Sequence, residues 1–441
     1  MVILIKAAQL LLSLSILVIF HEFGHYIAAK IFKTRVEKFY LFFDPWFSLF
    51  KFKKGETEYG VGWLPLGGYV KISGMIDESM DKEAMKLPPQ PWEFRSKPAW
   101  QRLIIMLGGV TVNILLAIGI YIITLAAWGD EYLPTSEVRF GITVDSVGQQ
   151  LGLKNGDKIL SVDNQVVEDF TKIPGRIILE NAKTIQIERE GQKMEVNVPM
   201  GFISKLIKHQ SADFINVRIP FEVAEFSKSS LAPAAGMKIG DKIIGLNELS
   251  TPWFDQFKSE LGKMKNKEVT VVALRGVDTV RMKVKVPSTG ILGIAPQLPI
   301  KYFSFKERHY NILQAIPAGV SKAYAGVGNY LKQLKLIFSP EVKAYESVGG
   351  FITIGKIFPS TWDWGAFWGL TAFLSIMLAI LNVLPIPALD GGHVLFLLFE
   401  IVTGRKPSDK FLEYAQIVGM VLLFGLLIFA NGNDIIKLFR H

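Results

Sequence analysis

Four apolar stretches of membrane-spanning length constrain this chain more than any other feature of its sequence. The stretch 103–128 contains no charged residue. The stretch 7–32 has 26 residues, which as a helix is about 39 Å long, more than the ~30 Å hydrocarbon core of a bilayer. The other two are 364–384 and, with its flanks, 417–430. Because helices satisfy their own backbone groups in lipid, the pattern predicts a polytopic α-helical membrane protein with about four transmembrane helices.

The composition requires a sizeable part outside the bilayer as well, since 20% of the 441 residues are charged. The chain has no cysteine, which excludes disulfides and thiolate metal sites. Its net charge of +9 is explained by basic loops beside the spans, and no dense basic patch interleaved with aromatics predicts a nucleic-acid partner. The first twenty residues are similar to a signal peptide but lack a small-residue cleavage site, so we expect this segment to be retained.

Positive charge near the ends of the spans predicts the orientation of the chain. The loop between the first two spans is rich in basic residues: Lys30, Lys33, Arg35, Lys38, Lys51, Lys53, Lys54, Lys71, Arg95, Lys97 and Arg102. Arg405, Lys406 and Lys410 follow the third span. By the positive-inside rule both loops are cytoplasmic, and 129–360 lies outside. The first helix therefore runs from outside to inside.

The outside segment contains an internal repeat. The sequence Gly-Leu-Lys-Asn-Gly-Asp-Lys-Ile at 152–159 returns as Gly-Met-Lys-Ile-Gly-Asp-Lys-Ile at 236–243, 84 residues later. Each copy is followed by strand-rich sequence with alternating apolar residues. The copies resemble the PDZ family over 138–200 and 217–297, and PDZ domains bind peptide ends by adding a strand to a sheet edge. Peptide binding and a purely steric filter both remain open for them.

The sequence His21-Glu22-Phe23-Gly24-His25 lies in the first apolar stretch. On a helix, His21 and His25 face the same side and can bind one zinc ion, while Glu22 can act as a general base toward a water molecule. An ionised group at mid-membrane costs about 2–3 kcal/mol, so such residues are by default functional. The alternative is a polar cluster at the end of a span that faces the lipid headgroups.

A zinc hydrolase normally has three protein ligands and one open position. No histidine lies in 26–35, and the nearby carboxylates are in a polar loop: Glu37, Glu56 and Glu58. A more distant candidate is Asp390, in the sequence Asn-Val-Leu-Pro-Ile-Pro-Ala-Leu-Asp-Gly-Gly at 382–392. Pro385 and Pro387 end the helix, and irregular backbone at membrane depth survives only where it is buried in protein or lines a cavity. Asp390 could also cap the next helix, and His393 is the second-ranked ligand.

These two motifs together resemble the site-2 protease family of intramembrane zinc metalloproteases, over the whole chain. The paired PDZ-like copies are similar to its bacterial regulator of sigma-E protease branch. The resemblance implies one Zn²⁺ per chain, held by His21, His25 and Asp390, with Glu22 as catalytic base. It also implies that Asn382 and Pro385 lie at the substrate. The chain departs from the family at 108–110 and 349–350, where the family often has Ala-Gly-Pro and Gly-Pro; only helix packing is affected.

The segment 58–73, Glu-Tyr-Gly-Val-Gly-Trp-Leu-Pro-Leu-Gly-Gly-Tyr-Val-Lys-Ile-Ser, predicts a β-hairpin that turns at 65–68. It resembles the family's membrane-associated β-loop, in which Gly67 and Gly68 would contact an unwound substrate. An ordinary cytoplasmic hairpin is the alternative. On the helix that follows, Gly109 and Asn113 are four residues apart, a small residue and an amide suited to close packing against the first span.

The expected organisation is a membrane protein with two extracytoplasmic (periplasmic) β-rich PDZ domains. In order, the segments are transmembrane helix 1 (1–33), a cytoplasmic loop with the hairpin (34–101), helix 2 (102–128), PDZ domains at 138–200 and 217–297, an amphipathic connection (305–360), helix 3 (364–400) and helix 4 (411–432).

The expected function is an intramembrane zinc endopeptidase of the bacterial inner membrane, with its active site toward the cytoplasmic half. Its expected substrates are single-pass membrane proteins, such as an anti-sigma factor already trimmed by a site-1 protease in stress signalling, or signal-peptide remnants. Its other expected partner is the lipid bilayer. One alternative is a membrane-anchored PDZ adaptor with a structural metal, and a weaker one is a metal transporter.

Overall fold

Four helices are long and apolar enough to cross a bilayer in the part of the chain that the structure describes. They are α1 (Val2–Ile31), α3 (Ala99–Trp128), α11 (Trp364–Val383) and α13 (Asp409–Phe439). The prediction of a polytopic helical membrane protein is therefore confirmed. The structure is a computed structural model, and it describes residues 1–65, 67–75, 88–208, 214–337 and 349–439.

The chain divides into two units, which are described separately. The membrane unit comprises Met1–Gly129, His309–Leu334 and Ser347–His441, and the repeat unit comprises Asp130–Arg308 and Lys335–Glu346. The membrane unit also contains the helices α8 (Ile312–Ile337), α10 (Phe351–Lys356) and α12 (Asp390–Thr403). The last three residues of α8 fall within the range that belongs to the repeat unit.

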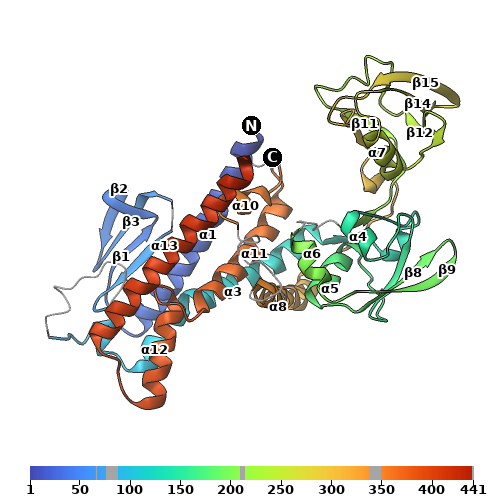
Figure 1. Ribbon diagram of the computed structural model, residues 1–441. Coiled ribbons are helices and arrows are strands. Elements are labelled where there is room, and N and C mark those ends of the chain that lie inside the picture. Colours follow the sequence, from blue (N-terminus) through green and yellow to red (C-terminus); the bar gives the residue numbers. More distant parts are fainter. Residues whose placement is uncertain (66, 76–87, 209–213, 338–348, 440–441) are drawn as a thin grey trace. The chain divides into compact units, whose positions relative to one another are not determined.

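Helices α1 and α3 both belong to the membrane unit (Figure 1), and their backbones are in direct contact where glycines meet. A Cβ added to Gly24 would lie 2.2 Å from the carbonyl oxygen of Gly108, and one added to Gly108 would lie 2.5 Å from that of Gly24. Only glycine allows this approach, because any side chain would have to occupy the space of the neighbouring backbone. Small residues at the interface are the usual way for helices to pack closely in a bilayer.

Apolar side chains pack the remaining helices around this crossing. Ala117 and Ile120 of α3 contact Ala372 and Ile376 of α11 in one buried cluster. A second cluster joins α1 to α11, and a third joins α1 and α3 to Leu397 of α12. The three clusters make α1, α3 and α11 a bundle with α12 against one end.

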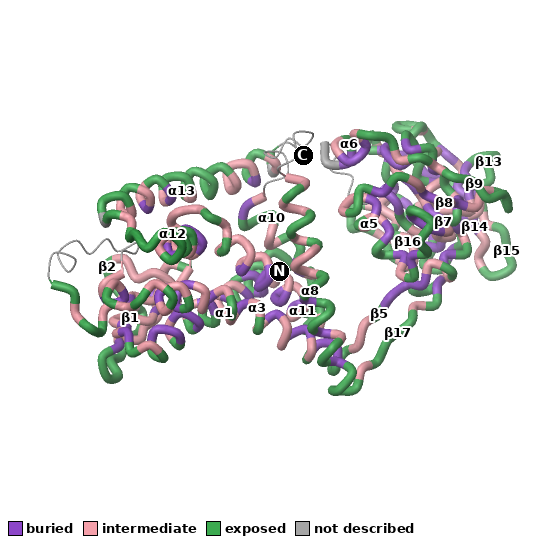
Figure 2. The backbone as a smooth tube through the Cα atoms, turned by 90° about the horizontal axis from the view of Figure 1, so that it is seen from below, coloured by how far each residue is buried: buried purple, intermediate pink, exposed green. Residues whose placement is uncertain are grey.

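Much of α13 is exposed, as the green segments along its tube show (Figure 2), and its exposed side chains include many apolar ones. Val421 is 69% exposed and Ile428 is 70% exposed. Exposed apolar side chains over a whole helix fit contact with lipid, where they carry no hydration penalty. The chain is a multi-pass membrane protein.

The last turns of α13 hold the short helix α10. The Asp434 carboxylate accepts hydrogen bonds from the backbone N–H groups of Gly350 (3.0 Å) and Thr353 (2.8 Å). Asn431 accepts from the N–H of Phe351 at 3.2 Å. These acceptors satisfy donors at the start of α10 that have no partner inside the helix.

A four-stranded sheet lies beside the C-terminal end of α1. Its strands are β1 (Val36–Leu41), β2 (Phe43–Lys54), β3 (Thr57–Leu64) and β4 (Tyr69–Ile72), in the order β2-β3-β1-β4. Val36 and Ile72 share a buried cluster with Ala28 and Ala29 of α1. The sheet is thus anchored to the helix that carries the histidines.

The pairing within this sheet corrects one expectation. The strands predicted to form a hairpin through 65–68 are present as β3 and β4, but β1 lies between them. β1 pairs parallel with β3 and antiparallel with β4. The tight hairpin is instead β2–β3, which turns at Gly55 with a φ of +63°. Local turn residues could not reveal that the preceding segment inserts between the two strands.

The repeat unit contains two buried cores, one for each sequence copy, and its small sheets are consistent with PDZ-like domains. The first copy has the sheet β7 (Lys158–Val162), β8 (Thr184–Arg189) and β9 (Gln192–Asn197). The second has β13 (Leu249–Ser250), β12 (Lys242–Leu246), β14 (Glu268–Arg275) and β15 (Asp278–Lys285).

Short strand pairs and helices complete this unit. The pairs are β5 (Asp130–Tyr132) with β17 (Lys306–Arg308), β6 (Ile142–Val144) with β10 (Ile215–Val217), and β11 (Val223–Phe226) with β16 (Ile294–Pro296). The helices are α4 (Ser146–Gln150), α5 (Ile173–Leu179), α6 (Phe202–Lys208) and α7 (Phe254–Gly262).

The repeated Gly-Asp turn has the same structural role in both copies. Asp241 is 1% exposed and accepts two hydrogen bonds from Arg275, at 2.8 and 2.7 Å. Asp157 receives the equivalent pair from Arg189, both at 2.8 Å. Burial raises the pKa of Asp241, but the Arg275 hydrogen bond and that from the N–H of Lys238 outweigh it and hold the pKa below its usual value.

We expect Asp241→Asn to loosen the second repeat at neutral pH. A carboxylate whose pKa is lowered by folding stabilises the fold above its unfolded pKa, near 3.8, and the stabilisation is lost as the pH falls through the folded value. Hydrogen exchange of 217–297 in the full chain should be roughly ten- to hundredfold faster at pH 7. The difference from wild type should narrow below pH 3.8. Asp278→Asn, at an exposed strand end, is the control and should exchange as wild type.

Candidate metal centre

Three side chains from distant parts of the chain meet in the membrane unit. His21 and His25 stand one turn apart on α1, and Asp390 is the first residue of α12. The Nε2 atoms of the two histidines are 3.3 Å apart, and each lies 3.2 Å from Oδ2 of Asp390. The three atoms form a nearly equilateral triangle. Both histidines are buried.

This triangle fits a tetrahedral Zn²⁺ ion. Ligand atoms placed tetrahedrally about 2.0–2.1 Å from zinc are about 3.3 Å from one another, and the observed separations are 3.2–3.3 Å. Two imidazoles and a carboxylate are also common ligands in catalytic zinc sites. Within the part of the chain that the structure describes, Oδ2 of Asp390 is buried without a hydrogen-bond partner, and a cation bound between it and the two imidazoles would satisfy it. The three residues leave a fourth position for water or substrate.

Asp390 is presented by a turn that contains two prolines. α11 ends at Val383, Pro385 and Pro387 follow, and Ala388 adopts a φ of +76°. A Cβ on Gly391 would lie 2.1 Å from the carbonyl oxygen of Leu384, so the turn folds tightly against the start of α12. The residue before α12 is Leu389, and no side chain caps the helix. The alternative role of Asp390 as a helix cap is therefore not seen; its carboxylate faces the histidines.

Two contacts with α13 support this turn. Ala388 donates its backbone N–H to Oε1 of Gln416 at 3.2 Å. A Cβ on Gly419 would lie 1.9 Å from the carbonyl oxygen of Pro387. Irregular backbone at membrane depth must be satisfied by neighbouring protein, and α13 provides both an acceptor and close packing.

The other ring nitrogen of His25 faces α3. Nδ1 of His25 lies 2.8 Å from the backbone carbonyl oxygen of Ile105. This oxygen can accept a hydrogen bond but cannot donate one. This contact places the ring proton on Nδ1 and leaves the Nε2 lone pair directed into the triangle. His21 has a matching neighbour on α3, with its Nδ1 3.2 Å from Nδ2 of Asn113.

Glu22 lies beside the triangle and faces the sheet. Its carboxylate lies near the backbone of Val70 in β4. A Cβ on Gly68 would lie 3.5 Å from Cγ of Glu22, which shows how closely the chain before β4 passes. Gly67 instead packs toward Phe43 of β2, with a φ of +150°.

Some of the other residues predicted from the sequence lie near the triangle, and others do not. Nδ2 of Asn382 lies 3.1 Å from Nε2 of His21, so its amide borders the triangle. Pro385 is exposed in the turn that leads to Asp390. Within the residues that the structure describes, the alternative ligands do not belong to the triangle. These are Glu37, Glu56, Glu58 and His393.

The sequence indicated only packing for α3, although this helix lines the site. Gly109 stands against both rings, since a Cβ there would lie 2.5 Å from Nε2 of His25 and 2.6 Å from Cε1 of His21. The spacing of Gly109 and Asn113 marked one face of the helix. It predicted packing against the first span, but not that the two residues contact the histidine rings.

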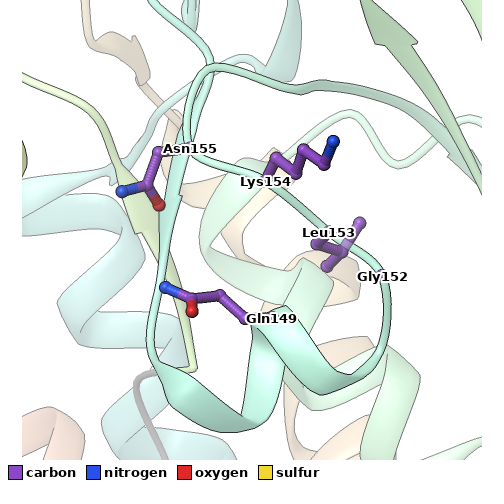
Figure 3. A pocket seen from close by; sticks show the side chains of 5 residues that line it. All are labelled: Gln149, Gly152, Leu153, Lys154 and Asn155. Atoms are coloured by element: carbon purple, nitrogen blue, oxygen red, sulfur yellow. The ribbon is translucent and has the colours of Figure 1, made fainter.

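A separate pocket in the first repeat has a different character. It has a volume of about 320 Å³ and is lined by Gln149, Gly152, Leu153, Lys154 and Asn155 (Figure 3). Its lining contains two amides and one ammonium group but neither histidine nor carboxylate. It therefore lacks both a metal site and an acid–base pair.

Comparison with known proteins gives matches to proteases. The model of peptidase family M50 matches residues 9–426. A protein of Xylella fastidiosa that carries the name of a zinc metalloprotease is 26% identical over 450 residues, covering 97% of this chain and 98% of its own. One of Campylobacter jejuni with such a name is 28% identical, with 97% and 92% covered. The Regulator of sigma E protease of Haemophilus influenzae is 26% identical, with 97% and 98% covered.

We expect Gly109→Ala to remove the metal site while α3 stays helical. The new methyl group would overlap His25, whose ring must move away from the triangle. Zinc per chain, measured by atomic emission, should fall at least about tenfold. Gly119→Ala is the matched control, because a Cβ at this position of the same helix meets nothing within 4 Å. Zinc retained in Gly109→Ala would contradict the geometry.

Proposed function

Because this chain belongs to peptidase family M50, we propose that it is an intramembrane zinc endopeptidase that cleaves transmembrane segments of single-pass membrane proteins. The family makes it a zinc metalloprotease. The observation that carries the finer proposal is the triangle that His21 and His25 of a membrane-spanning helix form with Asp390, with Glu22 beside it. A hydrolytic site at that depth is within reach of a peptide bond in another membrane helix.

The proposed chemistry uses four side chains. His21, His25 and Asp390 would hold the ion. When bound, Zn²⁺ would supply Lewis acidity to the scissile carbonyl and to the attacking water. Glu22 takes a proton from that water as the oxygen attacks the carbonyl carbon. The same carboxyl group then gives the proton to the amide nitrogen, and the C–N bond breaks.

Asn382 would bind the substrate near the reacting bond. Its amide nitrogen borders the triangle at 3.1 Å from Nε2 of His21. An amide N–H can donate to the oxygen of the scissile carbonyl, where negative charge develops. The exposed Pro385 lies three residues further along, in the turn that leads to Asp390.

The substrate must be extended, because a helix keeps its carbonyls in internal hydrogen bonds. β4 lies at the edge of its sheet, and an extended segment can add to such an edge through backbone hydrogen bonds. Gly68 brings this edge close to Glu22. An unwound substrate paired with β4 would therefore lie beside the catalytic base.

We propose that β2 attaches the sheet to the membrane surface. Trp46 is 90% exposed, and Leu49 and Phe50 are 65% and 61% exposed. Three lysines follow on the same strand: Lys51, Lys53 and Lys54. Aromatic side chains beside basic ones are typical of the boundary between headgroups and acyl chains.

The orientation predicted from the charges and the similarity to known proteins support a cellular location and a class of substrate. The positive-inside pattern supports a bacterial inner-membrane protein with its site toward the cytoplasmic half and its repeats outside. The similarity to a Regulator of sigma E protease supports an anti-sigma factor already trimmed outside as one substrate, and signal-peptide remnants are another of the same chemistry. The repeats would act as a filter for bulky outer domains or as a peptide-binding site.

Glu22→Gln should abolish cleavage without removing the metal, because glutamine keeps the shape but cannot accept the proton. We expect the rate for a co-expressed single-pass substrate to fall by at least about 10²-fold, and zinc per chain to be unchanged. Glu195→Gln, on an exposed part of β9, is the control. Undiminished cleavage by Glu22→Gln would exclude the proposed base.

Asp390→Ala should lose both metal and activity, since two histidines alone bind zinc weakly. Zinc per chain should fall at least about tenfold in protein purified without added metal. Asp363→Ala removes another aspartate at a helix start, one that caps α11, and should keep its zinc. An adaptor with a structural metal would keep its peptide binding after loss of Asp390, whereas a protease would lose cleavage.

A further inference from the structure

His21 has a polar neighbour on the side of its ring that faces away from the triangle. Asn113 of α3 is fully buried, and its amide lies 3.2 Å from Nδ1 of His21. When the amide nitrogen faces the ring, the amide oxygen of Asn113 is buried and has no hydrogen-bond partner among the described residues. A buried carboxamide inside a helix bundle requires a partner, so this contact is unlike ordinary packing.

The triangle determines which atom of His21 bears the proton. Nε2 of His21 lies with the other two ligand atoms, so its lone pair must face the ion and its ring proton must be on Nδ1. Nδ1–H can only donate. A side-chain N–H group facing it would oppose one donor to another.

The orientation of the amide follows from that proton. Exchanging the oxygen and nitrogen of an asparagine changes no heavy-atom position and is decided by its hydrogen bonds. With the nitrogen toward the ring, Oδ1 has no hydrogen-bond partner among the described residues. Only one of the two gives His21 an acceptor, the orientation with Oδ1 toward the ring.

We propose that Asn113 is a positioning residue whose side-chain carbonyl accepts the Nδ1 proton of His21 and so directs Nε2 into the metal triangle. The inference rests on the proposed zinc function of the three ligands. It assigns to Asn113 the task that the backbone carbonyl of Ile105 performs for His25 at 2.8 Å.

The backbone around Asn113 is held in a way that suits this task. Ser375 of α11 donates its hydroxyl to the backbone carbonyl of Asn113 at 2.7 Å, in the bundle interior. Ile105, Gly109 and Asn113 follow one another at intervals of four along α3, and all three are buried on the face toward α1. One face of one helix thus supplies an acceptor to each histidine, with the glycine between them making room for the rings.

The test measures zinc affinity rather than cleavage. Full-length protein in lipid nanodiscs is stripped of metal and titrated with Zn²⁺ against a chromophoric chelator. Asn113→Leu keeps the volume without the acceptor, Asn113→Ala removes the side chain, and Asn113→Asp keeps only acceptor oxygens. Thr111→Ala is the control on the same helix, since its hydroxyl bonds only to the preceding turn. The visible spectrum of the Co²⁺-substituted protein reports the geometry of the site independently.

We expect Asn113→Leu and Asn113→Ala to bind Zn²⁺ about 10- to 100-fold more weakly than wild type, and Asn113→Asp to stay within about threefold. Wild-type affinity in Asn113→Leu or Asn113→Ala would overturn the proposal. A loss in Asn113→Asp as large as in Asn113→Leu would also overturn it, because the amide nitrogen would then be the partner. If neither apolar variant folds, Asn113→Asp decides alone, supporting the proposal when zinc affinity is retained and contradicting it when affinity is lost.

Two results separate this inference from the proposed function. If wild type binds no Zn²⁺, or binds it equally well with Asp390→Ala, the proposed zinc site is wrong whatever Asn113 does. If wild type binds Zn²⁺ through Asp390 and Asn113→Leu binds it as tightly, only the role of Asn113 is wrong.

Discussion

The backbone contact between α1 and α3 is the constraint on which the rest of the site depends. At Gly24 and Gly108 the two helices approach until neither has space for a Cβ. This approach brings the carbonyl of Ile105 to 2.8 Å from His25 and the amide of Asn113 to 3.2 Å from His21. Hydrogen bonds of this length tolerate little displacement, so a wider crossing would leave the outer ring nitrogens without acceptors.

The third ligand depends on a different constraint, the cost of irregular backbone in a membrane. Residues 384–389 are not helical, and their polar groups must be satisfied by protein. Gly391 lets the turn fold back on Leu384, while Gly419 lets α13 pack against Pro387. Asp390 is therefore fixed by packing on both sides, and two rigid parts of the bundle meet at the triangle.

Much of this arrangement could be predicted from the chain, and some of it could not. The spans, the histidine pair and the repeat were predicted because hydropathy, helical spacing and the Gly-Asp turn are local signals. The hairpin through 65–68 was wrong in its pairing, because β1 lies between its strands and strand order depends on contacts outside the segment. The packing of α3 against the first span was predicted, but its contact with the histidine rings was missed for a similar reason. A sequence shows which face of a helix is small or polar, but not what faces it.

The sequence by itself determined the number of spans, the chemistry of the ligands and their placement on a helix and after a proline-broken span. Spacing brings His21 and His25 together, because four residues make about one helical turn. Only the tertiary structure decided that Asp390, far along the chain, completes their triangle with separations of 3.2 Å. The helix crossing and the packed turn set that distance, and both arise from contacts between segments that no local pattern records.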